Sequence, residues 1–139
     1  IHRVNYGENI GVEMLVKKIC DYEQNFTQYG GVRPFGMALL VAGTDDMGAH
    51  LFETDPSGAL VAYKATGIGN GRPAVMDLFE KEYKDGMTFE QAAVLGLKAL
   101  SAAVEEGLKA DSVEIGVAEI GSKFKRLSEK EVSELIAKM

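Results

Sequence analysis

The sequence contains little of what disulfide-bonded and metal-binding proteins are built from. Its 139 residues include one cysteine, Cys20, two histidines and no tryptophan. A single cysteine cannot form a disulfide within the chain, and two histidines far apart in sequence have no recognisable metal-ligand spacing. We therefore expect no disulfide framework, no metal site and no cofactor.

Long apolar runs and excess positive charge are also missing. The longest apolar run, residues 35–43, is far shorter than the roughly 20 residues that cross a bilayer, and no charged-then-apolar signal opens the chain. Fifteen Lys and Arg against 21 Asp and Glu give a formal net charge of -6, which would repel a phosphate backbone. We expect a cytoplasmic protein that binds neither membranes nor nucleic acids.

What is present is the composition of a folded protein. Hydrophobic residues make up 46% of the chain and charged residues 26%, too apolar a mixture for a disordered chain. A length of 139 residues matches one globular domain, and no linker interrupts it. We expect residues 1–139 to belong to one domain.

The first half predicts a helix followed by strands. Apolar residues at three-and-four spacing predict a helix over residues 12–29, with Cys20 on its apolar face and Gly30-Gly31 at its end. Residues 35–43 have no polar side, which predicts a strand buried on both faces, followed by a turn over residues 44–48. Strands at 51–53 and 60–66 flank a proline-containing turn and form a hairpin.

The second half predicts two helices, a second hairpin and a terminal helix. The helices are expected over residues 74–83 and 88–108, the second opened by a capping box, Thr88 with Gln91. Gly96 inside that helix is expected to permit close packing against a neighbour. Residues 113–120 and 124–127 form the hairpin, and a second capping box at Ser128 begins the last helix. Antiparallel hairpins between helices predict an α+β fold. The five short strands are expected to form about half of a larger sheet system.

Three groups of residues are candidates for chemistry. Residues 67–71, followed by Arg72, imitate a phosphate-binding turn, but Arg72 stands where the motif needs glycine, so a structural turn is the favoured interpretation. Cys20 has His2 and His50 as possible catalytic partners, but its place on an apolar helix face favours a buried structural thiol. Paired carboxylates could act as a general acid and a general base. Most of the candidates lie in turns, where aspartate is expected for local backbone bonding: Asp45, Asp46, Asp55 and Asp77.

Several strings closely resemble one known family. They are residues 29–36 (YGGVRPFG), 51–58 (LFETDPSG), 63–69 (YKATGIG) and 79–83 (FEKEY), in this order and with an apolar strand after the first. The chain resembles the alpha subunit of the archaeal 20S proteasome over essentially its whole length.

The resemblance implies an αββα sandwich of the N-terminal-nucleophile hydrolase type, with seven alpha subunits in a ring that caps catalytic beta rings. It implies a non-catalytic subunit that gates substrate entry for protein degradation, with other alpha subunits and beta subunits as partners. In this family the beta subunit's nucleophile is an N-terminal threonine. This chain begins with Ile1, so we expect no catalytic residue in it.

The length of the chain departs from the family pattern. Family members carry a gating tail, a first helix, several strands and a lysine-bearing activator pocket before the region that resembles residue 1 onward. We therefore expect a domain that lacks these elements, with any regulatory ATPase or activator bound through absent regions. Two alternatives remain: a catalytic beta-type peptidase subunit, or a structural fragment without independent activity. A nucleotide-binding module at residues 67–71 is a weaker third.

The string at residues 29–36 also supplies the candidate interface. Arg33 follows a glycine helix stop and precedes a proline, which predicts a defined loop that presents its side chain. We expect Arg33 to make a charge-assisted contact within a ring, with a solvated arginine as the alternative. The expected interface residues are Tyr29, Gly31, Arg33, Pro34 and Phe35.

Overall fold

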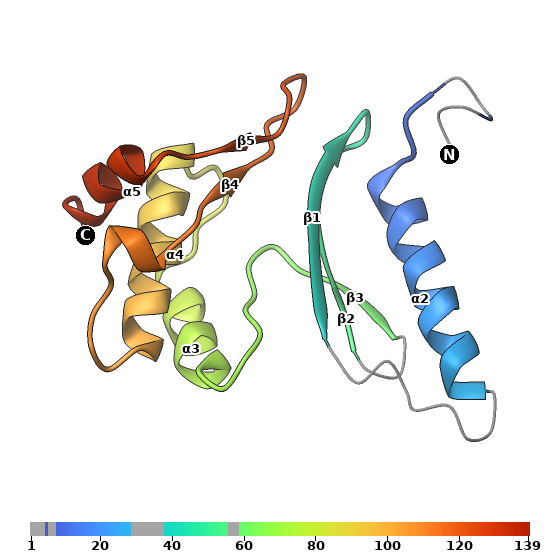
Figure 1. The fold of residues 1–139 in the computed structure, drawn as a ribbon, viewed down its shortest axis with the longest axis horizontal. Coiled ribbons are helices and arrows are strands. Elements are labelled where there is room, and N and C mark those ends of the chain that lie inside the picture. Colours follow the sequence, from blue (N-terminus) through green and yellow to red (C-terminus); the bar gives the residue numbers. More distant parts are fainter. Residues whose placement is uncertain (1–4, 6–7, 29–37, 56–58) are drawn as a thin grey trace. The chain divides into compact units, whose positions relative to one another are not determined.

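The computed structural model describes residue 5 and residues 8–28, 38–55 and 59–139, with the side chains of 23–28 outside the description. The chain forms two compact units. The first contains Ile1–Lys64 and Ala118–Ser122, and the second contains Ala65–Val117 and Lys123–Met139. The first unit combines one described helix, and the second unit several helices, with a small antiparallel sheet (Figure 1), so the expected α+β class is confirmed.

The first unit is built on one long helix, α2 (Val12–Gln28). Val12, Val16 and Cys20 are buried along one side of it and form a core with Phe52. The predicted helix and the buried thiol are both confirmed. The predicted inward face was too wide, because Leu15 and Tyr22 are 39% and 56% exposed. Only the narrower stripe at four-residue spacing reaches the sheet.

The sheet of the first unit has three antiparallel strands in the order β1 (Leu39–Asp45), β2 (Gly48–Thr54) and β3 (Leu60–Ala62). β1 and β2 pair over seven positions, from Leu39 with Thr54 to Asp45 with Gly48. Thr44 and Asp45, expected in the turn, therefore lie in the strand. The pairing leaves only two residues between the strands, because backbone hydrogen bonding continues to the end of the hairpin.

The prediction that β1 is buried on both faces is wrong. Burial alternates along its first half, with Leu40 and Ala42 exposed and Leu39 and Val41 partly buried. Side chains alternate between the two faces of a sheet, and paired residues share a face. α2 covers the face that carries Val41, Phe52 and Leu60. Residues 35–37 of the predicted strand lie outside the described residues.

The second unit contains three α-helices, and the last two of them supply most of a separate core. In chain order its elements are α3 (Arg72–Glu82), α4 (Phe89–Ala103), the 3-10 helix η1 (Ala110–Ser112), β4 (Gly116–Val117), β5 (Lys125–Arg126) and α5 (Glu129–Ile136). The core contains Leu97, Val113, Val132 and Leu135. The predicted second hairpin is confirmed, but its paired strands are only two residues each.

Capping side chains determine where α4 and α5 of this unit begin. The Thr88 hydroxyl accepts from the Gln91 N–H at 3.2 Å, and the Gln91 side chain accepts from the Thr88 N–H at 3.0 Å. Ser128 accepts from the Glu131 N–H at 3.3 Å at the start of α5. These bonds satisfy N–H groups that have no partner inside a helix. α4 ends at Ala103, five residues before the predicted end, because Val104 has extended backbone angles.

Candidate assembly interface

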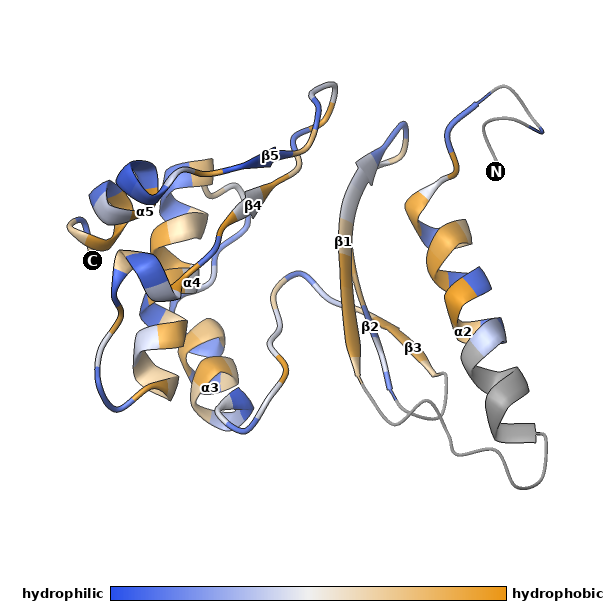
Figure 2. Cartoon of the chain, in the orientation of Figure 1, coloured by the Kyte–Doolittle hydropathy of each residue, from blue (hydrophilic) through white to orange (hydrophobic). Residues whose placement is uncertain are grey.

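The face of the first sheet away from α2 carries exposed apolar side chains. Leu40, Glu53 and Val61 are paired across the three strands and lie on this face. Leu40 is 36% exposed and Val61 is 47% exposed, and Ala42 and Ala49 on the same face are also exposed. Figure 2 shows hydrophobic colour along β1 and β3. We call these four apolar residues the open sheet face.

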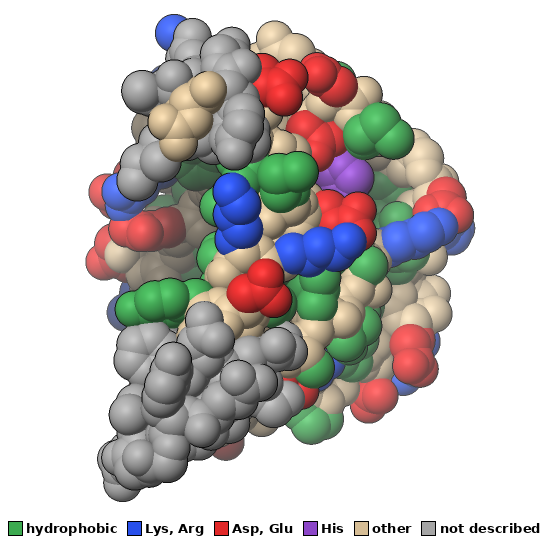
Figure 3. Space-filling view, turned by 90° about the vertical axis from the view of Figure 1, so that its right-hand side faces the viewer, with side chains coloured by type: hydrophobic (Ala, Val, Ile, Leu, Met, Phe, Trp, Pro, Cys, Tyr) green, Lys and Arg blue, Asp and Glu red, His purple; other side chains and the backbone are tan. Residues whose placement is uncertain are grey.

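α2 has a second apolar side besides the one that packs on the sheet. Met14, Leu15 and Tyr22 are 51%, 39% and 56% exposed. Leu15, Ile19 and Tyr22 follow each other at four and three residues, the spacing of a seam between packed helices. Figure 3 shows apolar side chains between charged ones on the face that includes this helix. α2 therefore has an apolar surface beyond the one used inside the first unit.

α4 in the second unit also keeps an apolar stripe exposed. Phe89 and Leu100 are each 44% exposed. Gly96 lies between them on the same side of the helix, at seven and four residues' distance. No described side chain or backbone atom comes within 4 Å of the place where a Gly96 Cβ would stand, so the close packing expected at Gly96 is not found within the described residues. Exposed apolar area of this kind is typical of surfaces that bind other polypeptides.

A polar cluster joins α2 to the β1–β2 hairpin. The Asp45 carboxylate accepts from the Val12 N–H at 2.9 Å, from the Met47 N–H at 2.8 Å, and contacts His50 Nε2 at 2.9 Å. The Val12 N–H, then His50 and Met47, hold the pKa of Asp45 below its ordinary value, because they favour the charged carboxylate. The His50 ring stacks on Phe52, with centroids 6.0 Å apart. Asp45 thus acts as an N-terminal cap supplied by another element.

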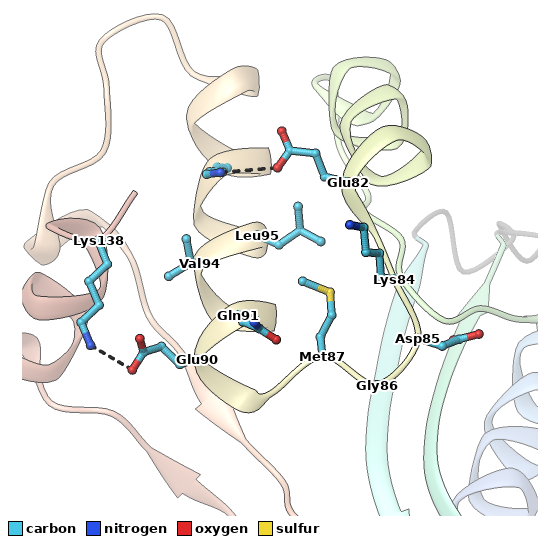
Figure 4. Close-up of a pocket in the computed structure, with 11 residues that line it drawn as sticks. Glu82, Lys84, Asp85, Gly86, Met87, Glu90, Gln91, Val94, Leu95 and Lys138 are labelled. Atoms are coloured by element: carbon cyan, nitrogen blue, oxygen red, sulfur yellow. Dashed lines mark hydrogen bonds and ion pairs between the residues drawn. The ribbon is translucent and has the colours of Figure 1, made fainter.

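A hollow of about 510 Å³ lies in the second unit, beside α4 (Figure 4). Met87, Val94 and Leu95 provide apolar lining. Its charged groups pair largely with one another, since Lys98 lies 3.5 Å from Glu82 and Lys138 lies 2.9 Å from Glu90. Two lysines and two glutamates of the lining are thus engaged in exposed ion pairs.

The candidates for catalysis stay apart or serve the fold. Cys20 is buried in the α2 core, and His50 is bound to Asp45, while His2 lies outside the described residues. Asp55 accepts from the Ala59 N–H at 3.0 Å, the local role expected of a turn aspartate. Among the residues that the structure describes, no three His, Cys, Asp or Glu side chains are grouped to hold a metal ion. No described helix is long and apolar enough to cross a membrane.

The glycines at residues 67–71 are explained by packing. A Cβ on Gly71 would stand 2.5 Å from the Cβ of Ala103, and one on Gly67 would stand 3.1 Å from Val75. Gly69 has a φ of +111°, which L side chains rarely adopt. These distances support the structural turn that the sequence favoured over a phosphate site.

The predicted interface residues Tyr29, Gly31, Arg33, Pro34 and Phe35 lie outside the described residues, so the interface at this loop remains a prediction. Sequence reasoning missed the bridging role of Asp45, because Val12 is 33 residues away in the chain. It also missed that apolar side chains of α2 and α4 are exposed, among them Tyr22 and Leu100.

Apolar surface left exposed on a sheet and on two helices is typical of proteins that pack against further polypeptide. A family model described as proteasome subunit matches residues 1–118, and the chain belongs to this family. Archaeal proteins named proteasome subunit alpha are similar over nearly the whole chain. The one from Methanosarcina thermophila is 53% identical over 137 residues, covering 98% of this chain and 56% of that protein.

Other archaeal relatives give the same result. Proteasome subunit alpha of Methanocaldococcus jannaschii is 51% identical over 140 residues, covering all of this chain and 53% of the relative. That of Methanoculleus marisnigri is 54% identical over 133 residues, covering 95% and 55%. The resemblance to an archaeal alpha subunit is therefore confirmed. The chain spans little more than half the length of these relatives.

Proposed function

We propose that this chain is part of a non-catalytic alpha-ring subunit of a 20S proteasome, which assembles the outer ring and gates substrate entry to the proteolytic chamber. The observation that carries the proposal is 51–54% identity, over nearly the whole chain, to archaeal proteins named proteasome subunit alpha. The exposed apolar surface supports it, because a ring subunit has to bury surface against neighbours.

The proposed complete fold is an αββα sandwich, to which residues 1–139 contribute part of one domain. The open sheet face supports this proposal. Leu40 and Val61 lie on a face opposite a helix layer, which is where a second sheet packs in a sandwich, about 10 Å away. The part of the relatives' length that this chain does not match would supply the missing strands.

The proposed partners are other alpha subunits in a heptameric ring and the beta subunits of the same particle, in the cytoplasm. A regulatory ATPase or activator would bind through regions that this chain does not contain. We place the loop of Tyr29, Gly31, Arg33, Pro34 and Phe35 at the contact within the ring, with Arg33 as its charged member. The family's shared string at residues 29–36 supports this placement.

The subunit is proposed to cleave no peptide bond itself. The similarity to proteins named proteasome subunit alpha supports this role, because in this family the N-terminal threonine nucleophile belongs to the beta subunit. A threonine peptidase needs an N-terminal threonine whose free amine acts as the base.

The test joins this chain to the unmatched remainder of the Methanosarcina thermophila relative. We expect rings of seven, or double rings of fourteen, in electron micrographs, and peptidase activity only after archaeal beta subunits are added. The purified alpha-type material should show no labelling by threonine-directed covalent inhibitors. Stoichiometric labelling without beta subunits would support the beta-type peptidase alternative instead, and the absence of any ring would refute the assembly role.

A further inference from the structure

The start of α2 is held against the hairpin by one carboxylate. Asp45 Oδ2 accepts from the N–H of Val12, the first residue of the helix, while Oδ1 accepts from Met47 in the turn and contacts His50 on β2. Asp45 is thus hydrogen-bonded to α2, to the turn and to β2. A carboxylate at a helix N-terminus also interacts favourably with the helix dipole.

A close apolar contact also attaches the first helical turn to the sheet. A Cβ on Gly43 would stand 3.0 Å from a methyl of Val12, so the first turn lies directly on β1. Further along, Val16 and Cys20 pack with Phe52. The β1–β2 hairpin has its own seven-pair backbone register, which does not depend on the Asp45 side chain. Loss of the carboxylate therefore affects the helix more than the hairpin.

We propose that Asp45 is an acid-sensitive latch that holds α2 on the sheet, and that neutralising this carboxylate lets α2 leave the sheet while the hairpin stays paired. The inference does not depend on the proposed function. Segments of a protein can open locally at a lower free energy than global unfolding, and a helix attached along one narrow stripe is such a segment.

The direction of the pH dependence follows from the bonds to Asp45. Because these bonds favour the charged form, the pKa of Asp45 lies below 3.8 in the folded chain. At pH values above 3.8 the carboxylate is charged and holds α2 on the sheet. As the pH falls through the lowered pKa, the carboxylate is protonated and releases α2. Other ionisable groups lie on the surrounding elements. On α2, Glu13 and Lys17 pair at 3.0 Å, and the hairpin carries Asp46 and His50. Glu119 lies near the hairpin, because its backbone carbonyl accepts from the Thr44 hydroxyl.

The test is hydrogen exchange of the full chain followed by mass spectrometry, with uptake normalised to the intrinsic rate at each pH. Asp45→Asn removes the charge at nearly constant shape, and Asp46→Asn is the matched control in the same turn. At pH 7 we expect Asp45→Asn to lower the protection of residues 12–22 on the order of tenfold, because one neutral amide oxygen cannot replace two charged carboxylate oxygens toward Val12, Met47 and His50, with little change in residues 39–54. Asp46→Asn should leave both segments unchanged.

A second measurement keeps the proposal testable if Asp45→Asn does not fold. In the unaltered chain, acidification should release the amides of α2 at a higher pH than those of the hairpin. Equal loss of protection in helix and hairpin, or unchanged α2 protection in Asp45→Asn, would overturn the latch.

Discussion

The packing of Gly71 against the end of α4 predicts a stability effect with a built-in rescue. Gly71 is the residue before α3, with an ordinary φ of -83°, so alanine there would suffer no backbone strain. Its Cβ, however, would stand 2.5 Å from the Cβ and 3.3 Å from the Cα of Ala103. The first of these distances is far below a van der Waals contact, and the Cα belongs to the backbone of α4 and cannot rotate away.

The size of the effect follows from three contributions. Overpacking of this kind costs about 1–3 kcal/mol. The smaller entropy of an unfolded chain with alanine in place of glycine offsets about 0.4–1 kcal/mol of this. Ala103→Gly costs at most about 0.5–1 kcal/mol by itself, the cost of glycine in the middle of a helix, because Ala103 is the last residue of α4. In the double variant the clashing Cβ is gone, so its cost should fall below the sum of the two single costs by about 1–2 kcal/mol.

The assay is urea unfolding of the four chains of this cycle, followed by circular dichroism at 222 nm. The chain has no tryptophan, so helix content is the suitable signal. If the double variant loses less unfolding free energy than the two single variants together, the contact between Gly71 and Ala103 is confirmed. Additive costs, or a Gly71→Ala chain as stable as the original, would show that Gly71 and Ala103 are not packed together and would reopen the phosphate-turn interpretation of residues 67–71.

Three further predictions concern single side chains. Leu97 is 2% exposed, so Leu97→Ala should lower the unfolding free energy of the chain by about 2–5 kcal/mol. Leu100 on the same helix is 44% exposed, so Leu100→Ala should lower it far less in the same urea assay. Gly96→Ala should stabilise the isolated chain by about 1 kcal/mol, because its Cβ meets nothing within 4 Å among the described residues; destabilisation would reveal a tightly packed neighbour. Arg33→Ala should weaken ring assembly or peptidase gating in the joined subunit, and unchanged assembly and gating would favour a solvated arginine.

Periodicity and capping were sufficient to predict most elements. The four-residue spacing of Val12, Val16 and Cys20 predicts α2, and the Thr88 signal predicts the first turn of α4, because both depend on residues close in sequence. The same reasoning failed for Leu15 and Tyr22. Spacing shows that a side chain is apolar and on a helix face, but it cannot show whether the covering surface belongs to the same chain.

The candidate site was harder to predict because its parts are long-range. Nothing near Asp45 in the sequence indicates that its carboxylate caps a helix 33 residues earlier. Likewise, the apolar run at residues 35–43 predicted burial on both faces, and Leu40 is exposed. An apolar run shows that a strand has apolar side chains on both faces, but it does not show which surfaces are present to cover them.

The exposed apolar surface leads to a prediction about the chain by itself. β1 and β3 are the outer strands of the described three-stranded sheet, so each has one edge without a partner strand in that sheet, and outer strands with apolar side chains promote association. Complete burial of a leucine or valine side chain contributes about 1.5–3 kcal/mol. With Leu40 36% exposed and Val61 47% exposed, association regains on the order of 1 kcal/mol at each of these positions.

We therefore expect the 139-residue chain to form concentration-dependent oligomers in sedimentation velocity. Leu40→Lys with Val61→Lys should shift it toward smaller species, because two charges on the open sheet face oppose its burial. Met47→Lys is the matched control: Met47 is 87% exposed in the hairpin turn and lies off that face. In the joined subunit the same double change should abolish rings, since the face would then be buried against a second sheet. A monodisperse monomer of the unaltered chain that unfolds cooperatively would refute this reasoning, because it would show that the open sheet face needs no cover.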